Sequence, residues 1–540
     1  MFPADSVTAL LISVIALDRV SSEPRLPSAF QGAVALQERR VVVVGAGVAG
    51  LAAADYLLNR LHLRNVTVLE ASGGIGGRVH AVQIDDGSYL QMGAQYLHNA
   101  ENEVFRIARR LQLIPSQQAR HAIQLNITLQ NKLFSQKYTC HCSAKSEIKR
   151  LFNRPSLFFR CTGEPMERTR IERFWAWYHG VCNDRSVFQS ARFRNESIGT
   201  ILDLHFHRYI TEQHTESEKQ LMLEFRNFYN RAFGEEYAAA DVFKNNWCLG
   251  AAEQNDPDSF IAVPLYGRGL SAVVDDLASR LPANTIHLRS RVTSIDWQHS
   301  HQSSAVTVFL ANGRTVPADH VIVTVPLGVL KQTELLRFSP PLPLRKRNAI
   351  RHIGFETLDK VFLRYERPFW SMDSSLIVLL RPGRRVHRDH QACGSLGGLA
   401  DVFWVFSTDL YDPTLLLAWI GGRNDVLRVE SASLDELAAA ATAALRRHTN
   451  YTHVPWPVEV IRTVWRHNPH FLGAYSVSNE AARRAGYSFA DIAQPLLSTR
   501  TNKPIVQFAG EATHDRWHQT VHGAHDSGLR EAMRLHASYR

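Results

Sequence analysis

The chain has 540 residues, more than one hydrophobic core usually organises, so we expect at least two domains. Its 45% hydrophobic and 21% charged residues are typical of a folded protein and exclude a largely disordered chain. The net charge is +10, but the basic residues are scattered and form no run interleaved with aromatic residues, which argues against a surface for nucleic acid or another polyanion.

Residues 1–37 are predicted to be a signal peptide or a disordered tail. The apolar stretch 7–17 has the length of a signal peptide, and Ser21 and Ser22 suit a cleavage site, but Asp5 and no basic residue precede the stretch. Secretion and a cytoplasmic location therefore both stay open. No later segment is long and apolar enough to cross a bilayer, so we expect no integral membrane segment.

A βαβ unit is expected directly after this segment, with a buried strand over 41–44, a helix over 48–61 and a second strand over 66–69. The turn before the helix has the sequence GAGVAG, and an acidic residue follows its last glycine by 20 residues. Such glycines let the backbone approach a pyrophosphate, and an acid at this distance binds a ribose hydroxyl. The residues predicted to bind a dinucleotide are Gly45, Gly47, Ala49, Gly50 and Glu70.

A second glycine cluster, residues 73–79 (GGIGGRV), indicates which dinucleotide is bound. A nicotinamide enzyme has no need of such a cluster just after the ribose-binding acid. In FAD enzymes of the glutathione-reductase-like type, a cluster of this kind with an arginine covers the pyrophosphate, where Arg78 can donate charge-assisted hydrogen bonds. The sequence therefore favours FAD.

From about residue 40 to residue 535 the chain resembles the flavin-containing amine oxidase family, and within it most the animal spermine and N1-acetylpolyamine oxidases. Besides the glycine motifs, the matching segments are 93–98, 290–295, 325–330, 508–513 and 521–528. The resemblance implies an α/β fold, with a Rossmann-type FAD-binding domain (glutathione-reductase-like) and an inserted α+β substrate-binding domain. It also implies that the final helix points its N-terminus at the flavin, where it stabilises negative charge. Further FAD contacts are implied for Ala94, Gln95, Val292, Glu511, Thr520 and Val521.

The resemblance also assigns residues around the amine. Lys360, on a strand expected over 360–365, matches the lysine that these oxidases place near the flavin N5 to hold a water. Tyr475 matches an aromatic wall of the amine slot. Thr520 stands where monoamine and plant polyamine oxidases have a second aromatic wall, and it matches the animal spermine and acetylpolyamine oxidases, so the resemblance favours polyamines over monoamines. His98 matches a histidine assigned to substrate contact. No cysteine lies near Tyr475, where covalently flavinylated relatives carry one, so non-covalent FAD is expected.

We expect the FAD-binding domain to comprise residues 38–100, 262–330 and 454–540, and the substrate-binding domain residues 101–261 and 331–453. Further strands are expected over 292–297, 306–310, 321–325 and 505–508, and further helices over 216–233, over 434–447 and from 523 onward. Glu253, Asp256 and Asp258 could bind distal amines, but a solvated acidic loop is the favoured interpretation. The six cysteines lack zinc-site spacing, so no metal site is expected, while local disulfides stay open.

These features together predict an FAD-dependent oxidase that converts polyamines, such as spermine, spermidine or their N-acetyl forms, with O2 to an aldehyde, a shorter amine and H2O2. The expected partners are the small amine and O2, with no nucleic acid, and the oligomeric state stays open. Two other functions also stay open. One is an N-methyl-lysine demethylase-like oxidase, which shares the Lys360 motif, and the other is a flavin-binding partner protein that has lost catalysis.

Overall fold

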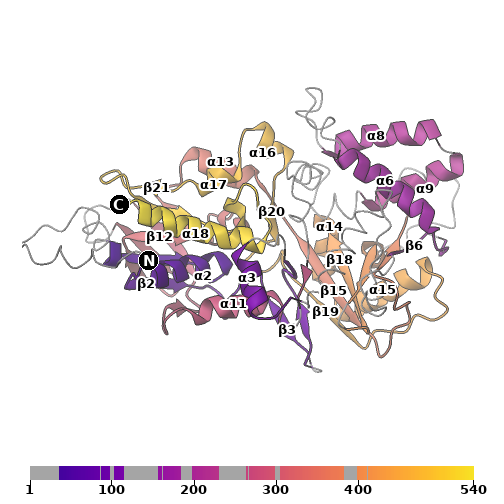
Figure 1. The fold of residues 1–540 in the computed structure, drawn as a ribbon, viewed down its shortest axis with the longest axis horizontal. Helices are drawn as coiled ribbons and strands as arrows, with labels where there is room; N and C mark the ends of the chain where they lie inside the picture. Colours follow the sequence, from indigo (N-terminus) through magenta and orange to yellow (C-terminus); the bar gives the residue numbers. More distant parts are fainter. Residues whose placement is uncertain are drawn as a thin grey trace, which may run out of the picture.

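The structure is a computed structural model. It describes residues 36–84, 87–97, 102–114, 156–160, 162–183, 198–213, 215–229, 263–265, 267–297, 305–381, 398–409 and 412–540. Figure 1 shows two lobes along the longest axis, one around a mostly parallel sheet and one around a mostly antiparallel sheet.

The sheet of the first lobe has six strands in the order β21-β22-β12-β1-β2-β8. Neighbouring strands are parallel except β21 and β22, so the predicted βαβ unit and the tail of the chain share one sheet. Its strands are β1 (Arg40–Val44), β2 (Asn65–Leu69), β8 (Ile286–His287), β12 (His320–Val323), β21 (Leu496–Leu497) and β22 (Pro504–Phe508).

The two faces of β1 enter two different cores, because strand side chains alternate. Val41 and Val43 pack under a layer of helices, whereas Val42 and Val44 pack against a second, four-stranded sheet of order β11-β10-β9-β13. Burial on both faces explains the continuous β-branched run. The helices are α2 (Val48–Asp55), α3 (Glu103–Arg110), α11 (Leu270–Ser279) and α18 (Val521–Ala537), and the second sheet contains β9 (Val292–Asp296), β10 (Val306–Leu310), β11 (Thr315–Ala318) and β13 (Arg337–Ser339).

Helices α2 and α18 lie against each other, although they come from opposite ends of the chain (Figure 1). A Cβ atom on Gly528 would lie 2.1 Å from the carbonyl oxygen of Ala49, so this approach requires glycine. The helix expected over 48–61 ends differently from the prediction, since α2 passes into the π-helical turn η1 (Tyr56–Arg60). The final helix begins at Val521, two residues earlier than expected.

The second lobe is built on a sheet of order β19-β15-β18-β17-β16-β6, in which only β6 and β16 pair in parallel. On β15, Val361 and Leu363 face one core and Phe362 faces another, as the alternation predicts. Helix α15 begins at a capping box formed by Ser433 and Glu436. The strands are β6 (Ser156–Phe159), β15 (Leu358–Arg364), β16 (Leu376–Leu379), β17 (Val405–Thr408), β18 (Leu415–Gly421) and β19 (Glu459–Arg462).

Helices cover this sheet and complete the lobe. Helix α15 (Leu434–His448) packs on one core, and α6 (Arg168–Asn183), α8 (Ile198–Gln213) and α9 (Glu216–Tyr229) form another with β6 and β16. The remaining elements are β3 (Ala81–Gln83), β4 (Tyr89–Gln91), β5 (Tyr96–Leu97), β7 (Val263–Pro264), α12 (Leu327–Leu330), α13 (Leu344–His352), β14 (Gly354–Glu356), η5 (Gly398–Val402), α14 (Arg423–Ser431), β20 (Tyr475–Val477), α16 (Glu480–Arg484), α17 (Phe489–Ala493) and η6 (Glu511–Thr513).

Some segments near the expected domain borders pair across them. Strand β13 pairs with β9, and α13 packs in the core of the first lobe, whereas β19 pairs with β15 in the second lobe. Helix α3, expected in the substrate-binding domain, likewise packs in the core of the first lobe. The assignment of residues to two domains therefore stays a proposal, with these four elements moved according to their packing. Within the part of the chain that the structure describes, no helix has the length and apolar character needed to cross a membrane.

Candidate active site

A cavity of about 1170 Å³ is lined by residues of both lobes. The first lobe contributes the glycine motifs and the start of α18, and the second contributes β15, β17 and β18. Most of the residues selected from the sequence meet there: Gly45, Gly47, Ala49, Glu70, Arg78, Ala94, Gln95, Val292, Lys360, Tyr475, Glu511, Thr520 and Val521. Gly50 is not part of the lining. His98, like Glu253, Asp256 and Asp258, lies outside the described residues.

The close approach of the turn after β1 to the first turn of α2 requires glycine at two positions, Gly45 in the turn and Gly50 in the helix. Gly45 has a φ of +112°, which disfavours any residue with a side chain. A Cβ atom on Gly50 would lie 1.9 Å from the carbonyl oxygen of Gly45. Gly47 is the N-cap of α2, where no side chain caps the helix and no acidic residue occupies the first turn. The turn thus brings an uncompensated helix N-terminus to the cavity.

Glu70 follows β2 and lies at the edge of this turn. Its carboxylate accepts hydrogen bonds from the backbone N–H groups of Ala46 and Ser72, both at 2.8 Å. A carboxylate has about four acceptor positions, so two backbone donors leave capacity for a further hydroxyl. The side chain therefore holds the turn in place and faces the cavity at the same time.

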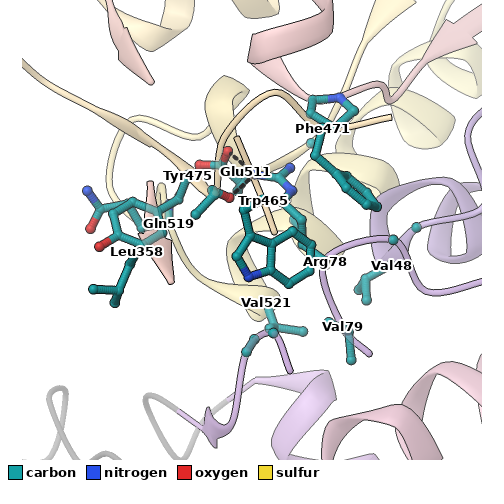
Figure 2. A pocket seen from close by; sticks show the side chains of 18 of the residues that line it. Val48, Arg78, Val79, Leu358, Trp465, Phe471, Tyr475, Glu511, Gln519 and Val521 are labelled. Atoms are coloured by element: carbon teal, nitrogen blue, oxygen red, sulfur yellow. Dashed lines mark hydrogen bonds and ion pairs between the residues drawn. The ribbon is translucent and has the colours of Figure 1, made fainter. Parts of the chain in front are cut away.

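Arg78 and Glu511 form an ion pair in the cavity wall, with 2.7 Å between Nη1 and Oε1 (Figure 2). Arg78 also donates to the carbonyl oxygen of Ala474, while Glu511 accepts from the hydroxyl of Ser476 and the backbone N–H of Gln519. Burial alone would raise the pKa of Glu511, but Arg78 and these hydrogen bonds outweigh it and hold the pKa below its usual value. The pair thus joins three segments that are far apart in the sequence.

Lys360 is almost completely buried, with 3% of its surface exposed. Its ammonium donates to the carbonyl oxygens of Gln91 and Gly93, each at 2.7 Å, and to the side-chain oxygen of Gln95. The ring of Trp419, directly opposite on β18, lies 4.8 Å from the nitrogen. Burial lowers the pKa of Lys360 to about 7. The three hydrogen bonds that the ammonium donates act in the opposite direction and favour the charged form. The cavity thus has a cation that titrates near neutrality.

Aromatic side chains form much of the remaining wall. Trp465, Phe471 and Tyr475 come from one segment, and Figure 2 shows them around the cavity. The rings of Trp465 and Phe471 meet edge to face at 5.2 Å. Gly473, with a φ of +142°, shapes the turn before Tyr475. Ring faces of this kind attract a cationic amine and exclude water.

Thr520 has a structural task at the start of α18. Its hydroxyl accepts from the backbone N–H of Gly523 at 3.0 Å and donates to the carbonyl oxygen of Trp517 at 2.8 Å. Thr520 is therefore the N-cap of the helix, and the first turn contains no acidic residue. This second helix N-terminus also lines the cavity, so its positive end favours an anionic group there.

The first-lobe half of the cavity fits FAD. Two helix N-termini without acidic residues suit phosphates and a flavin edge that gains negative charge, and Glu70 suits a ribose hydroxyl. No cysteine lines the cavity among the described residues. Those same residues contain no cluster of histidine, cysteine or acidic side chains able to hold a metal ion.

Several lining residues had no distinct signal in the sequence. Trp404 and Trp419 lie in or beside buried strands, where an aromatic residue is ordinary. Asp425, near the start of α14, is a buried acid whose position follows only from the pairing of β18 with β15. Lys360 lines the cavity from β15, and the pairing of β15 with β18 brings Trp419 opposite it.

Comparisons with known proteins agree with this arrangement. Residues 48–536 match the family described as flavin containing amine oxidoreductase. The chain is 27% identical over 525 residues to the human peroxisomal N(1)-acetyl-spermine/spermidine oxidase, covering 92% of this chain and 94% of the relative. It is 27% identical over 573 residues to probable polyamine oxidase 5 of Arabidopsis thaliana, covering 93% and 99%. A putrescine oxidase structure with bound putrescine has the same fold, with a TM-score of 0.58, 21% identity and 93% and 99% coverage.

Proposed function

Because the chain belongs to the family of flavin-containing amine oxidoreductases, with the FAD-binding α/β fold that this implies, we propose that it oxidises polyamines. The expected products with O2 are an aldehyde, a shorter amine and H2O2. The relatives support this choice, since they include an acetylated polyamine oxidase and a plant polyamine oxidase. The substitution of Thr520 for an aromatic residue supports it as well.

One observation carries the proposal: Lys360 and an aromatic chamber line the same cavity as the dinucleotide-binding turn. Bound in the first-lobe half, FAD supplies a two-electron acceptor that O2 restores. We propose Gly45, Gly47, Ala49 and Glu70 at its adenosine and pyrophosphate end, with Gly50 supporting the turn. Arg78, Ala94, Gln95, Val292, Glu511, Thr520 and Val521 are the other proposed contacts. We propose non-covalent binding, because no cysteine stands near Tyr475 in the sequence.

Lys360 and the aromatic walls are assigned to the amine. Lys360 can hold a proton or a water at Nζ, because its pKa of about 7 leaves both protonation states accessible near neutrality. Trp465 and Tyr475 orient the amine between ring faces and exclude bulk water. The loss of a C–H bond beside the nitrogen then leaves an imine, which water hydrolyses to the aldehyde and the shorter amine.

The test mixes the FAD-loaded protein anaerobically with spermine, spermidine, N1-acetylspermine and a panel of monoamines while flavin absorbance is recorded. Bleaching by a polyamine, followed by return of colour and H2O2 on admission of air, is the expected result. Bleaching by monoamines or by a methylated lysine peptide alone would contradict the polyamine assignment. A flavin that no amine bleaches would contradict catalysis.

A further inference from the structure

Two buried carboxyl groups lie behind the aromatic wall, outside the cavity lining, and the amine chemistry does not use them. Asp359, one residue before Lys360 on β15, is 0% exposed, and the side chain of Glu430 on α14 is likewise 0% exposed. Glu430 lies beside Asp359 and, together with burial, raises the pKa of Asp359 well above its usual range, while Oδ2 of Asp359 has no hydrogen-bond partner among the described residues. A proton on this carboxyl pair, Asp359 and Glu430, would satisfy the buried oxygen, because a carboxylate by itself has no proton to donate.

The carboxyl pair accepts hydrogen bonds from three successive backbone N–H groups. Asp359 accepts from the N–H of Trp465 at 3.2 Å. Glu430 accepts from the N–H of Arg466 at 2.7 Å and from that of His467 at 3.0 Å. The segment that carries the Trp465 indole into the cavity is thus held at its backbone by two acids from another part of the chain.

The same pair is connected to the backbone of Lys360. The hydroxyl of Thr463 donates to Asp359 at 2.7 Å and accepts from the N–H of Lys360 at 2.8 Å. The N–H of Thr463 donates in turn to the carbonyl oxygen of Lys360 at 3.0 Å. A single polar cluster therefore fixes both the lysine and the tryptophan wall.

We propose that the Asp359–Glu430 carboxyl pair, sharing one proton, is a positioning element that holds Lys360 and Trp465 in register with each other. The effect of this positioning on the reaction rests on the function proposed for Lys360. The positions of Lys360 and Trp465 themselves can be tested without any substrate. Loss of the shared proton would place two facing carboxylates in a buried site, where they repel each other. Alkaline conditions are therefore expected to loosen the wall formed by Trp465.

Other titratable groups occupy the elements that carry or contact the carboxyl pair, so pH effects must be assigned with variants. Burial and Glu430 both raise the pKa of Asp359 well above its usual range. The imidazole of His467 contacts Glu430. The charged or titratable groups on these elements are Glu356, Lys360, Arg364, Arg423, Asp425, Arg428, Glu459, Arg462, Arg466 and His467.

Replacement of Asp359 by asparagine removes the titratable proton but keeps a side chain that can form the same hydrogen bonds. In Asp359→Asn the amide N–H can donate to Glu430, and its oxygen can still accept from Thr463 and Trp465. In Asp359→Ala these hydrogen bonds are lost. Glu430→Gln provides a second isosteric test from the other side, and Glu224→Gln is the control, because Glu224 is a buried acid of the same lobe paired with Arg160.

Two measurements on the full chain with FAD bound need no amine. The infrared absorption of protonated carboxylic acids is expected to be the same in the parent and in Glu224→Gln and to lose one component in Asp359→Asn and in Glu430→Gln, while a component of Glu356, whose pKa burial raises to about 7, is retained. Hydrogen exchange at the N–H groups of residues 465–467 is expected to remain slow in Asp359→Asn and to become about tenfold faster in Asp359→Ala. An acid absorption that is unchanged in both isosteric variants, or unchanged exchange in Asp359→Ala, would overturn the proposal.

The functional half uses the rate of flavin bleaching by an active amine as a function of pH. Asp359→Ala is expected to slow bleaching about tenfold or more, Asp359→Asn to restore most of the rate, and the alkaline decline caused by the pair to be absent from Asp359→Asn. Equal rates in Asp359→Ala and the parent would refute positioning. If no amine bleaches the flavin, the polyamine proposal fails, while the infrared and exchange results still decide the proposal for the carboxyl pair.

Discussion

Replacement of Glu511 by glutamine should destabilise the first lobe and weaken FAD binding. The Glu511 carboxylate has hydrogen-bond donors on both sides. Arg78 donates to one oxygen, and the hydroxyl of Ser476 and the N–H of Gln519 donate to the other. A glutamine amide offers an acceptor to only one side, so its two N–H donors face other donors in either rotamer. Glutamine is therefore similar in size but cannot satisfy this site.

The expected cost is about 3 kcal/mol, the lower end of the range for breaking a buried pair. The side chain of Glu511 is 6% exposed and that of Arg78 is 21% exposed, so water can partly solvate the arginine after the change. The pair also fixes both neighbours of Tyr475, because Arg78 binds the Ala474 carbonyl and Glu511 binds Ser476. Misplacement of Tyr475 is expected to accompany the loss of stability.

The assay is a double-mutant cycle of Glu511→Gln, Arg78→Met and the double variant, with urea unfolding of the FAD-free protein and FAD titration of each. The two single costs should exceed the cost of the double variant by about 2 kcal/mol, because the second change removes the unpaired charge. Asp319→Asn is the control, since Asp319 pairs with Arg40 away from the cavity and should leave FAD affinity intact. The reasoning would be refuted if the losses of unfolding free energy in the two single variants added up to the loss in the double variant. A urea midpoint for Glu511→Gln equal to that of the parent would refute it as well.

Three further predictions concern the cavity. Glu70→Ala should weaken FAD binding about tenfold to a hundredfold while the circular dichroism of the fold is retained, because two backbone donors and a ribose hydroxyl lose their acceptor. Lys360→Met should slow turnover or flavin reoxidation about a hundredfold or more in stopped-flow traces and remove a rate change centred near pH 7; a variant with full rates in both would exclude Lys360 from the mechanism. Gly50→Ala should abolish FAD retention during purification, because its Cβ would lie 1.9 Å from the Gly45 carbonyl oxygen, whereas Gly74→Ala, with no atom within 4 Å of its Cβ, should bind FAD normally.

Elements with strong local signals could be predicted from the sequence. The β-branched run at 41–44, the glycine turn and Glu70 specify the βαβ unit, because each residue type is required by the backbone at its own position. The strand over 306–310 was predicted to the residue, and helix α15 began at its capping box. These signals act over a few residues, so they do not depend on the rest of the fold.

Contacts between distant segments could not be predicted in the same way. The ion pair of Arg78 with Glu511, 433 residues away, had no signal in the sequence. The three acceptors around Lys360 lie more than 260 residues from it in the sequence. Only the pairing of β15 with β18 brings Trp419 to the lysine. Such contacts arise from strand pairing and packing within and between the two lobes, which residue spacing does not encode.

The charge distribution of the cavity has a consequence for the protonation state of the amine. Lys360 and the N-terminus of α18 place positive charge beside the aromatic wall where the proposed reaction occurs, and this charge opposes a second cation. Trp465 and Tyr475 can attract an ammonium group on its way in, but they do not neutralise its charge. An amine that reaches this position is therefore favoured in its neutral form, the form whose nitrogen lone pair can support loss of the neighbouring C–H bond. We therefore expect the positive charge of Lys360 to favour the reactive, neutral form of the proposed substrate.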